Sequence, residues 1–334
     1  MPGILRSRYS VKRFILWDVI LTVSLCPGVL GQQFLSRDNA AAGDCLLAAS
    51  SSSSGPGSAV CDHQAVQELA RSGHAFAQNQ MGIESALVVG QRRTILDARK
   101  WFEKAAANGY APAQVNLAVL YLNGWGTTQN YGAALYWLKS AAENGNARAH
   151  TNLGVLYMNG WGVKRDYAEA LVHFRYAAKH GETGAMVDLG YMNDAGLGMP
   201  QDSAAAAGWY RQAAERGDSL GQNNLADMFL RGDGVAQNDA LARSWFEKAA
   251  AQGHTGARIK LGYMYAANRG GLQDPEAAYA WILSAVLAGD ARGQEYLAPL
   301  EKQLSPEQIA RARKSAEALK SVEAHAIPEL AFVR

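Results

Sequence analysis

Apolar residues recur along most of the chain at the spacing of one face of an α-helix. In one stretch they stand at i, i+3, i+4, i+7 and i+8, as Ala134, Trp137, Leu138, Ala141 and Ala142. This periodicity predicts an amphipathic helix with one buried face. A second apolar stretch, roughly Ala111 to Leu122, precedes it and predicts a partner helix. The pattern therefore predicts helices in pairs.

The predicted helix pair repeats with a period of 36 residues. Seven glycines follow this period without a gap: Gly73, Gly109, Gly145, Gly181, Gly217, Gly253 and Gly289. A column that is aromatic except for one histidine follows the same period: Trp101, Trp137, His173, Trp209, Trp245 and Trp281. Self-similarity at a fixed period of this size predicts a solenoid of stacked helix pairs.

Polar residues mark the predicted start of each second helix, in the column Thr94, Asn130, Asp166, Asp202, Asn238 and Asp274. Each of these side chains can accept a hydrogen bond from a backbone N–H of the first turn. The glycine column is expected to end the same helices in the left-handed conformation. Gly-x-Gly pairs such as Gly160 and Gly162 are expected to reverse the chain between two helices.

Small and large residues share the predicted core. Ala141 and Ala142 would let neighbouring helices approach closely. The rings of Trp137 and Tyr121 are then expected to fill the space between helix pairs. His173 stands in the aromatic column and is expected to be a packed core residue.

The stretch "ARAHTNLGVLYMNGWGVKRDYAEALVHFRYAAKHG" resembles the Sel-one-like repeat, a relative of the tetratricopeptide repeat. The resemblance covers about residues 74–289 as six units. The first unit is degenerate, since Ser85 replaces an aromatic residue and Arg92-Arg93 fall in the expected turn. The resemblance implies an all-α fold, a right-handed α/α superhelical solenoid of about six 36-residue helix-turn-helix repeats with helical caps. It also implies a concave face and a role in holding proteins together.

Changes in composition along the chain predict further segments before and after the repeats. The expected parts are a signal peptide at 1–31, a flexible Ser/Gly-rich linker at 32–61, a capping helix at 62–73, the repeats at 74–289, C-terminal capping helices at 290–321, and a tail at 322–334. In the C-terminal part, a helix is expected from Ala291 to Gln303, and another after Ser305 as N-cap with Pro306 in its first turn.

The N-terminus has a basic start followed by an apolar run from Phe14 to Leu25 and small residues before Gln32, as in a secretory signal. Asp18 interrupts the apolar run, so an uncleaved membrane anchor and a misplaced start codon stay open. The expected location is periplasmic or secreted, with membrane anchoring through an uncleaved signal as the alternative. In an oxidising compartment Cys45 and Cys61 could form a disulfide, or they are two idle thiols.

A formal net charge of +2 is too near neutral to suggest nucleic acid as a main partner. The sequence holds no HExxH and no GxGxxG motif. We therefore expect a protein that is not an enzyme and has no metal and no cofactor. After removal of the signal, no other stretch is apolar for long enough to insert into a membrane.

A protein or peptide partner is expected on the concave face formed by the first helices. The residues expected to line it are Val119, Asn123, Val155, Asn159, Tyr191, Asp227, Arg231 and Tyr263. Trp125 and Trp161 lie in successive inter-helix turns and form a contact patch or fold over the turns beneath them. The expected function is a non-catalytic adaptor or regulator in a bacterial-type cell envelope. A peptidoglycan- or β-lactam-binding protein and a cytosolic adaptor stay open as alternatives, and so does the oligomeric state.

Overall fold

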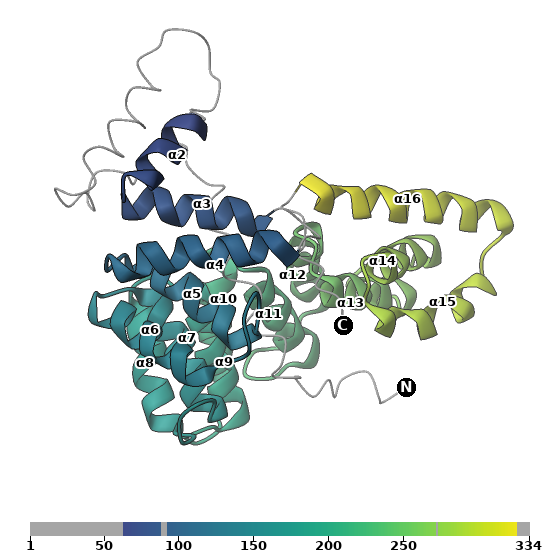
Figure 1. Ribbon diagram of the computed structural model, residues 1–334. Coiled ribbons are helices and arrows are strands. Elements are labelled where there is room, and N and C mark those ends of the chain that lie inside the picture. Colours follow the sequence, from purple (N-terminus) through teal and green to yellow (C-terminus); the bar gives the residue numbers. More distant parts are fainter. Residues whose placement is uncertain (1–62, 88–91, 272, 326–334) are drawn as a thin grey trace, which may run out of the picture. The chain divides into compact units, whose positions relative to one another are not determined.

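The computed structural model describes residues 63–87, 92–271 and 273–325, and these residues form helices and turns with no strand (Figure 1). The predicted signal peptide and linker, with Cys45 and Cys61, lie outside the described residues. So does the tail from residue 326 onward.

Six consecutive helix pairs make up most of the described chain. They are α3 (Ala75–Leu87) with α4 (Arg92–Ala107), α5 (Ala111–Asn123) with α6 (Tyr131–Glu143), α7 (Ala147–Asn159) with α8 (Tyr167–Lys179), α9 (Thr183–Ala195) with α10 (Ser203–Glu215), α11 (Ser219–Arg231) with α12 (Asp239–Ala251), and α13 (Thr255–Ala266) with α14 (Pro275–Leu287). Helix α2 (His63–Arg71) precedes them. The prediction of an all-α solenoid built from paired helices is confirmed.

The chain divides into two compact units, Met1–Asp166 and Tyr167–Arg334. The boundary falls between the two helices of the third pair. Within the units, consecutive helices pack against each other from α2 to α7 and from α8 to α15 (Gln294–Glu301), and the last described helix of the chain packs against α14. A single pair cannot bury both of its faces, so this stacking supplies the core.

Four of the predicted N-caps are confirmed. The side chains of Asn130, Asp202, Asn238 and Asp274 each accept a hydrogen bond of 2.9 Å from a backbone N–H three residues later. The prediction is wrong for Thr94, because α4 already begins at Arg92. Arg92 and Arg93 therefore lie in the first helical turn, where arginine is a good helix former, and not in the inter-helix turn.

The glycine column ends the second helices as predicted, with φ between 73° and 100° at all seven positions. The inter-helix pairs also have positive φ. At Gly162 φ is 70°, and an added Cβ would lie 2.7 Å from Cβ of Tyr131. Asn268 replaces one of these glycines and keeps a positive φ of 55°. Asparagine tolerates this region better than most residues do, which explains the replacement.

The core corrects one expectation about the aromatic column. Trp137 and Tyr121 are only half-buried at the margin of the core. The residues that fill the interior come one position later, as Phe102, Leu138, Phe174, Tyr210, Phe246 and Ile282, each at most 3% exposed. The apolar stripe is wide enough to include both columns, and only the later one points between the helices. His173 likewise lies at the margin, partly exposed and with Nε2 3.7 Å from Glu169.

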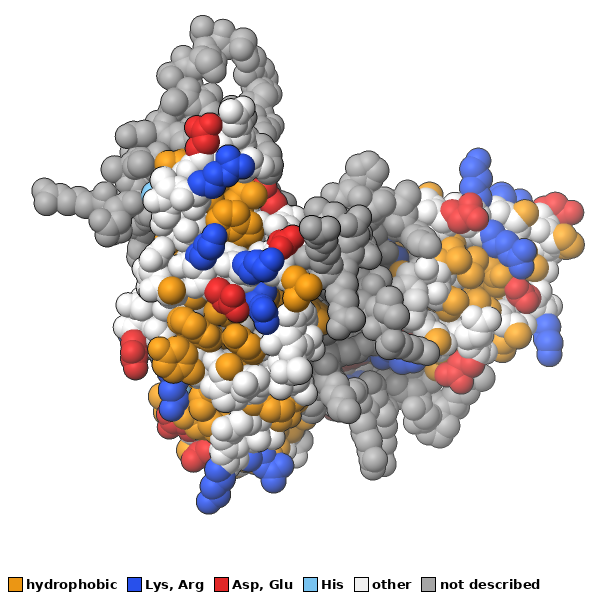
Figure 2. All heavy atoms as spheres, viewed as in Figure 1, with side chains coloured by type: hydrophobic (Ala, Val, Ile, Leu, Met, Phe, Trp, Pro, Cys, Tyr) orange, Lys and Arg blue, Asp and Glu red, His pale blue; other side chains and the backbone are white. Residues whose placement is uncertain are grey.

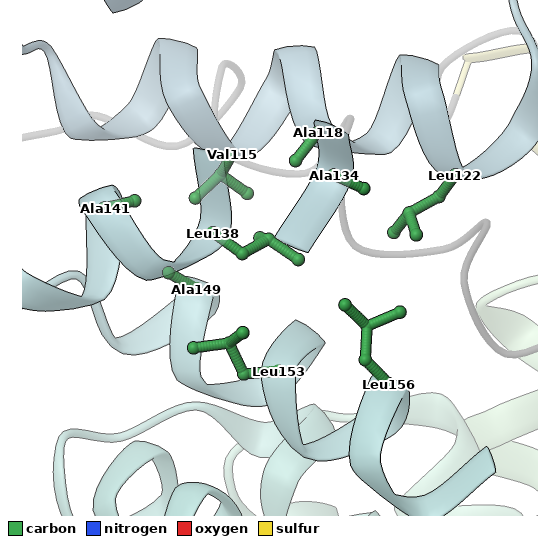
Figure 3. Close-up of a cluster of buried hydrophobic side chains, with 9 residues drawn as sticks. All are labelled: Val115, Ala118, Leu122, Ala134, Leu138, Ala141, Ala149, Leu153 and Leu156. Atoms are coloured by element: carbon green, nitrogen blue, oxygen red, sulfur yellow. The ribbon is translucent and has the colours of Figure 1, made fainter. Parts of the chain in front are cut away.

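Figure 3 shows the interior of the second pair. Leu138 of α6 lies between side chains of α5 and α7. The cluster consists of Val115, Ala118, Leu122, Ala134, Leu138, Ala141, Ala149, Leu153 and Leu156. Its four alanines allow the close approach of helices that the sequence suggested.

The C-terminal part differs from the expected single helix over Ala291 to Gln303. A 3₁₀ turn η3 (Ala291–Gly293) leads into the short helix α15 (Gln294–Glu301). Two contacts explain the break: the Asp290 side chain accepts a bond from the Arg292 N–H, and Gly293 packs closely against α14.

Helix α16 (Pro306–His325) starts as predicted and extends beyond residue 321. Ser305 and Gln308 form a reciprocal cap. The Ser305 hydroxyl accepts a bond from the Gln308 N–H at 3.3 Å, and the Ser305 N–H donates to the Gln308 side chain at 2.8 Å.

Candidate partner-binding surface

In the first unit, most of the side chains predicted to bind a partner are buried or half-buried. Val119 is 1% exposed and Val155 is 7% exposed, so neither presents its side chain to a partner. Asn123 and Asn159 are half-buried, and their amides donate to the Val119 and Val155 carbonyls at 2.9 and 2.8 Å. The first helices are covered on several sides by their neighbours, which the pattern of a single helix does not reveal.

In the second unit, the predicted residues form a more open and more polar surface. Tyr191 and Tyr263 are half-buried. Burial, and then the nearby Tyr167, raise the pKa of Tyr191, so its phenol stays protonated. Arg231 pairs with Asp233 at 3.0 Å. Asp227 is mostly buried and carries an ion pair that the sequence did not predict.

The partner of Asp227 is Lys260, which comes from α13, one repeat later. The Lys260 ammonium also donates to the Asn223 side chain at 3.2 Å. Lys260 is 27% exposed at its side chain and Asp227 is 12% exposed. Lys260 was missing from the predicted set although the repeat offered a signal: it shares a polar column with Asn116, Asn152, Asp188 and Asn224.

Polar contacts of this kind also join successive first helices in the first unit. The Asn116 amide donates to the Asn79 side chain at 2.9 Å, and both residues are buried. Such buried polar pairs need partners on the neighbouring helix. They fix how one first helix sits on the next.

At a second repeat position, the side chains are used in hydrogen bonds to the backbone of the preceding helix. Side-chain N–H groups of Gln78, Gln114, Gln222 and Arg258 each donate at 3.2 Å to a backbone carbonyl eight residues earlier. These carbonyls belong to the last turn of the preceding helix, which is α2 for Gln78 and a second helix for the others, and no residue within that helix donates to them. These hydrogen bonds therefore tie each of these first helices to the helix that precedes it.

The two turn tryptophans fold over the turns beneath them. The Trp161 ring stacks on Tyr131 with centroids 5.8 Å apart and planes 17° apart. Trp125 packs against the core of the first pair. Both rings are half-buried, so only their outer parts reach the surface.

Two histidines act as helix caps. Nδ1 of His74 and of His254 accepts a bond from a backbone N–H three residues later, at 3.4 and 3.0 Å. Burial and then the nearby Lys260 lower the pKa of His254 to about 4. In the described ranges no three His, Cys, Asp or Glu side chains gather in a way that could hold a metal ion.

Six consecutive segments match the model of the Sel1 repeat: residues 75–110, 111–146, 147–182, 183–218, 219–254 and 256–290. The matches cover more than half of the chain. The chain belongs to the Sel1 repeat family. Its degenerate first unit is a repeat like the others. The family matched is that of a repeat scaffold, and no catalytic family is identified.

Solved structures agree with this assignment. A Sel1 repeat protein from Oxalobacter formigenes is 31% identical with a TM-score of 0.63, and the match covers 74% of this chain and 96% of that one. A protective antigen present in uropathogenic Escherichia coli strains, which displays an SLR fold, is 33% identical with a TM-score of 0.60, and 80% of this chain is covered. This chain spans 58% of the length of that antigen. A search of curated proteins gives no match.

In the described part of this Sel1 repeat protein, no helix is both long enough and apolar enough to cross a membrane.

Proposed function

We propose that this Sel1 repeat protein is a non-catalytic scaffold that binds an extended segment of another protein on the first-helix face of its second unit. Sel1 repeats typically mediate protein binding. The observation that carries the proposal is the partly exposed Lys260–Asp227 pair on a face that also holds Tyr191 and Tyr263.

The chemistry of this face suits a peptide. A lysine ammonium has three donors, and Lys260 directs hydrogen bonds to Asp227 and Asn223. A partner carbonyl or carboxylate can take a further bond. Tyrosine rings supply apolar area at a low cost in side-chain entropy, and their hydroxyls add polar contacts. The face therefore combines aromatic anchors with a fixed polar centre.

The proposed place of action is the cell envelope, as a secreted or periplasmic protein. The proposal rests on the basic start and apolar run of residues 1–31. N-terminal sequencing of the protein purified from its native source tests it. A mature N-terminus at Gln32 supports an exported protein, and an intact N-terminus in a cytosolic fraction favours the alternative of a cytosolic adaptor.

Crosslinking followed by affinity capture from native envelope extract tests the binding face. The bait proteins are the wild type, the Tyr191→Ala/Tyr263→Ala double variant and the Tyr136→Ala control. Tyr136 is 66% exposed on a second helix, so its loss removes a tyrosine without touching the proposed face.

One stoichiometric protein is expected with the wild type and the control, and its loss with the double variant. A protein captured equally by all three baits would contradict the proposed face. Recovery of muropeptides without a protein would contradict the proposed partner class and favour a peptidoglycan-binding protein.

A further inference from the structure

The C-terminal end of the second unit contains a groove between α14, α15 and α16. The groove encloses about 310 Å³. Its apolar side is lined by Leu283, Leu287 and Leu297. Figure 2 shows hydrophobic side chains gathered between charged ones in this part of the molecule, on the right of the view.

The sequence provides this apolar lining only in the last repeat. Leu283 occupies a column that is charged in the five earlier repeats: Glu103, Lys139, Arg175, Arg211 and Glu247. Leu287 stands where the earlier repeats have alanine, glutamate or lysine. The outer face of α14 is therefore apolar where the other second helices are suited to water.

The capping helices cover this apolar face only in part. Helix α15 has 8 residues, whereas α13, the first helix of the last repeat, has 12. Helix α16 packs along α14, yet Leu287 stays 38% exposed at one end of the groove. An exposed leucine beside further leucines in a concave site is a feature of binding grooves.

The other end of the groove is polar and carries a net negative charge. The Tyr279 hydroxyl donates to Oε1 of Glu301 at 2.6 Å, and Nη2 of Arg313 lies 3.6 Å from the same oxygen. Glu317 also lines the groove, and no ion pair joins it to another residue in the described part of the chain. Two carboxylates thus face one guanidinium.

We propose that this groove binds a short peptide segment in which a large apolar side chain is followed closely by a lysine or arginine. The apolar side chain contacts Leu283, Leu287 and Leu297. The basic side chain pairs with Glu317, whose charge Arg313 does not balance. The enclosed volume suits one large side chain with its adjoining backbone, and not a whole helix.

The groove shares no residue with the Lys260 face. The proposal for the groove can therefore be disproved while the proposed function of the Lys260 face stands, and the reverse also holds. Burial and then the hydrogen bond to Glu301 raise the pKa of Tyr279, which keeps the phenol protonated as a donor to that carboxylate. Glu301 is therefore held by two partners. Glu317 is the carboxylate available to a ligand.

Selection from a random heptapeptide phage library against the full-length chain tests the proposal. Enriched peptides are resynthesised with a fluorescent label, and their affinities are measured by fluorescence polarisation. Leu287→Asp and Glu317→Lys change the groove. Leu241→Asp and Glu215→Lys make the same changes at exposed positions on α12 and α10 and serve as matched controls.

The enriched peptides are expected to pair a large apolar residue with a nearby lysine or arginine. Each groove variant is expected to weaken binding by about tenfold or more, as the loss of one well-formed contact does. Both controls should bind as the wild type does.

Failure to enrich any peptide, enrichment of acidic peptides, or binding unaffected by the groove variants would overturn the proposal. Glu317 is exposed on α16, so Glu317→Lys tests the charge even if Leu287→Asp loosens α16. Thermal unfolding of each variant confirms that it is folded.

Discussion

Lys260 of α13 reaches back to Asp227 of α11 and forms an ion pair between successive repeats. The same ammonium lies 5.5 Å from the centre of the Phe246 ring and bonds to Asn223. One side chain thus ties together the first helices of two repeats. It also places a positive charge at the edge of the face proposed for binding.

The first prediction concerns this pair. Lys260→Met leaves the mostly buried Asp227 carboxylate without its counter-charge, and we expect a loss of about 1–3 kcal/mol in the free energy of unfolding. The Lys260→Met/Asp227→Leu double variant should recover most of that loss. Urea unfolding followed by circular dichroism measures both. Equal losses in the single and the double variant would contradict the coupling.

The second prediction separates the two adjacent aromatic columns. Phe246→Ala should cost about 3–5 kcal/mol, because the ring is fully buried and leaves a cavity. Trp245→Ala should cost less, since the indole is half-buried and its outer face carries Lys248 at 3.8 Å. Denaturant unfolding of both variants gives the order. A larger loss for Trp245→Ala would show that the tryptophan column is the true core.

The third prediction concerns pH. The pKa of His254 falls from its usual 6.5 to about 4 in the fold, owing to burial and then to Lys260. Arg292 also lowers it, and Asp290 opposes the shift. The unfolded chain therefore binds the proton more readily than the folded one. The contribution of neutral His254 to the free energy of unfolding is therefore fully present above pH 6.5. It is lost as the pH drops toward 4, and the loss is on the order of 3 kcal/mol.

His254→Asn is the matched control for this prediction, because asparagine can still cap the helix and does not titrate. Unfolding free energies of the wild type and the variant are compared between pH 7 and pH 4. The wild type should lose more stability than the variant over this range. Parallel curves for the two proteins would exclude His254 as the titrating group.

The fourth prediction compares two glycines with positive φ. Gly181→Ala should cost about 1–2 kcal/mol, because only the strained backbone opposes it and no atom lies within 4 Å of the added Cβ. Gly162→Ala should cost more, since its Cβ would also meet Tyr131 at 2.7 Å. Thermal unfolding ranks the two variants. The reverse order would mean that the turn after α7 adapts freely.

The sequence predicted those features that each repeat shows by itself. The glycine column, the caps at Asn130 and Asp202 and the helix pairing all follow from spacing and local backbone chemistry. The cap at His254 was also within reach. Its column holds Asn146, Asp218 and Asp290, which are strong capping residues at the same register.

Features that depend on a neighbouring repeat could not be predicted from the spacing within one repeat. Phe246 and Trp245 are adjacent aromatic residues on one apolar stripe, and only the packing of the next helix decides which one is buried. Val119 follows the same spacing as Tyr263, yet its neighbours cover it. The Lys260–Asp227 contact joins residues from different helix pairs, and its geometry arises only when the repeats stack.

Photo-crosslinking tests most directly whether a partner protein binds the first-helix face of the second unit, as proposed. A photo-crosslinking phenylalanine analogue is placed at position 263 in one protein and at position 136 in another, and both are irradiated in native envelope extract. We expect position 263 to form a covalent adduct with one protein and position 136 to form none. Adducts from position 136 alone, or from neither position while the partner is still captured, would exclude this face as the binding site.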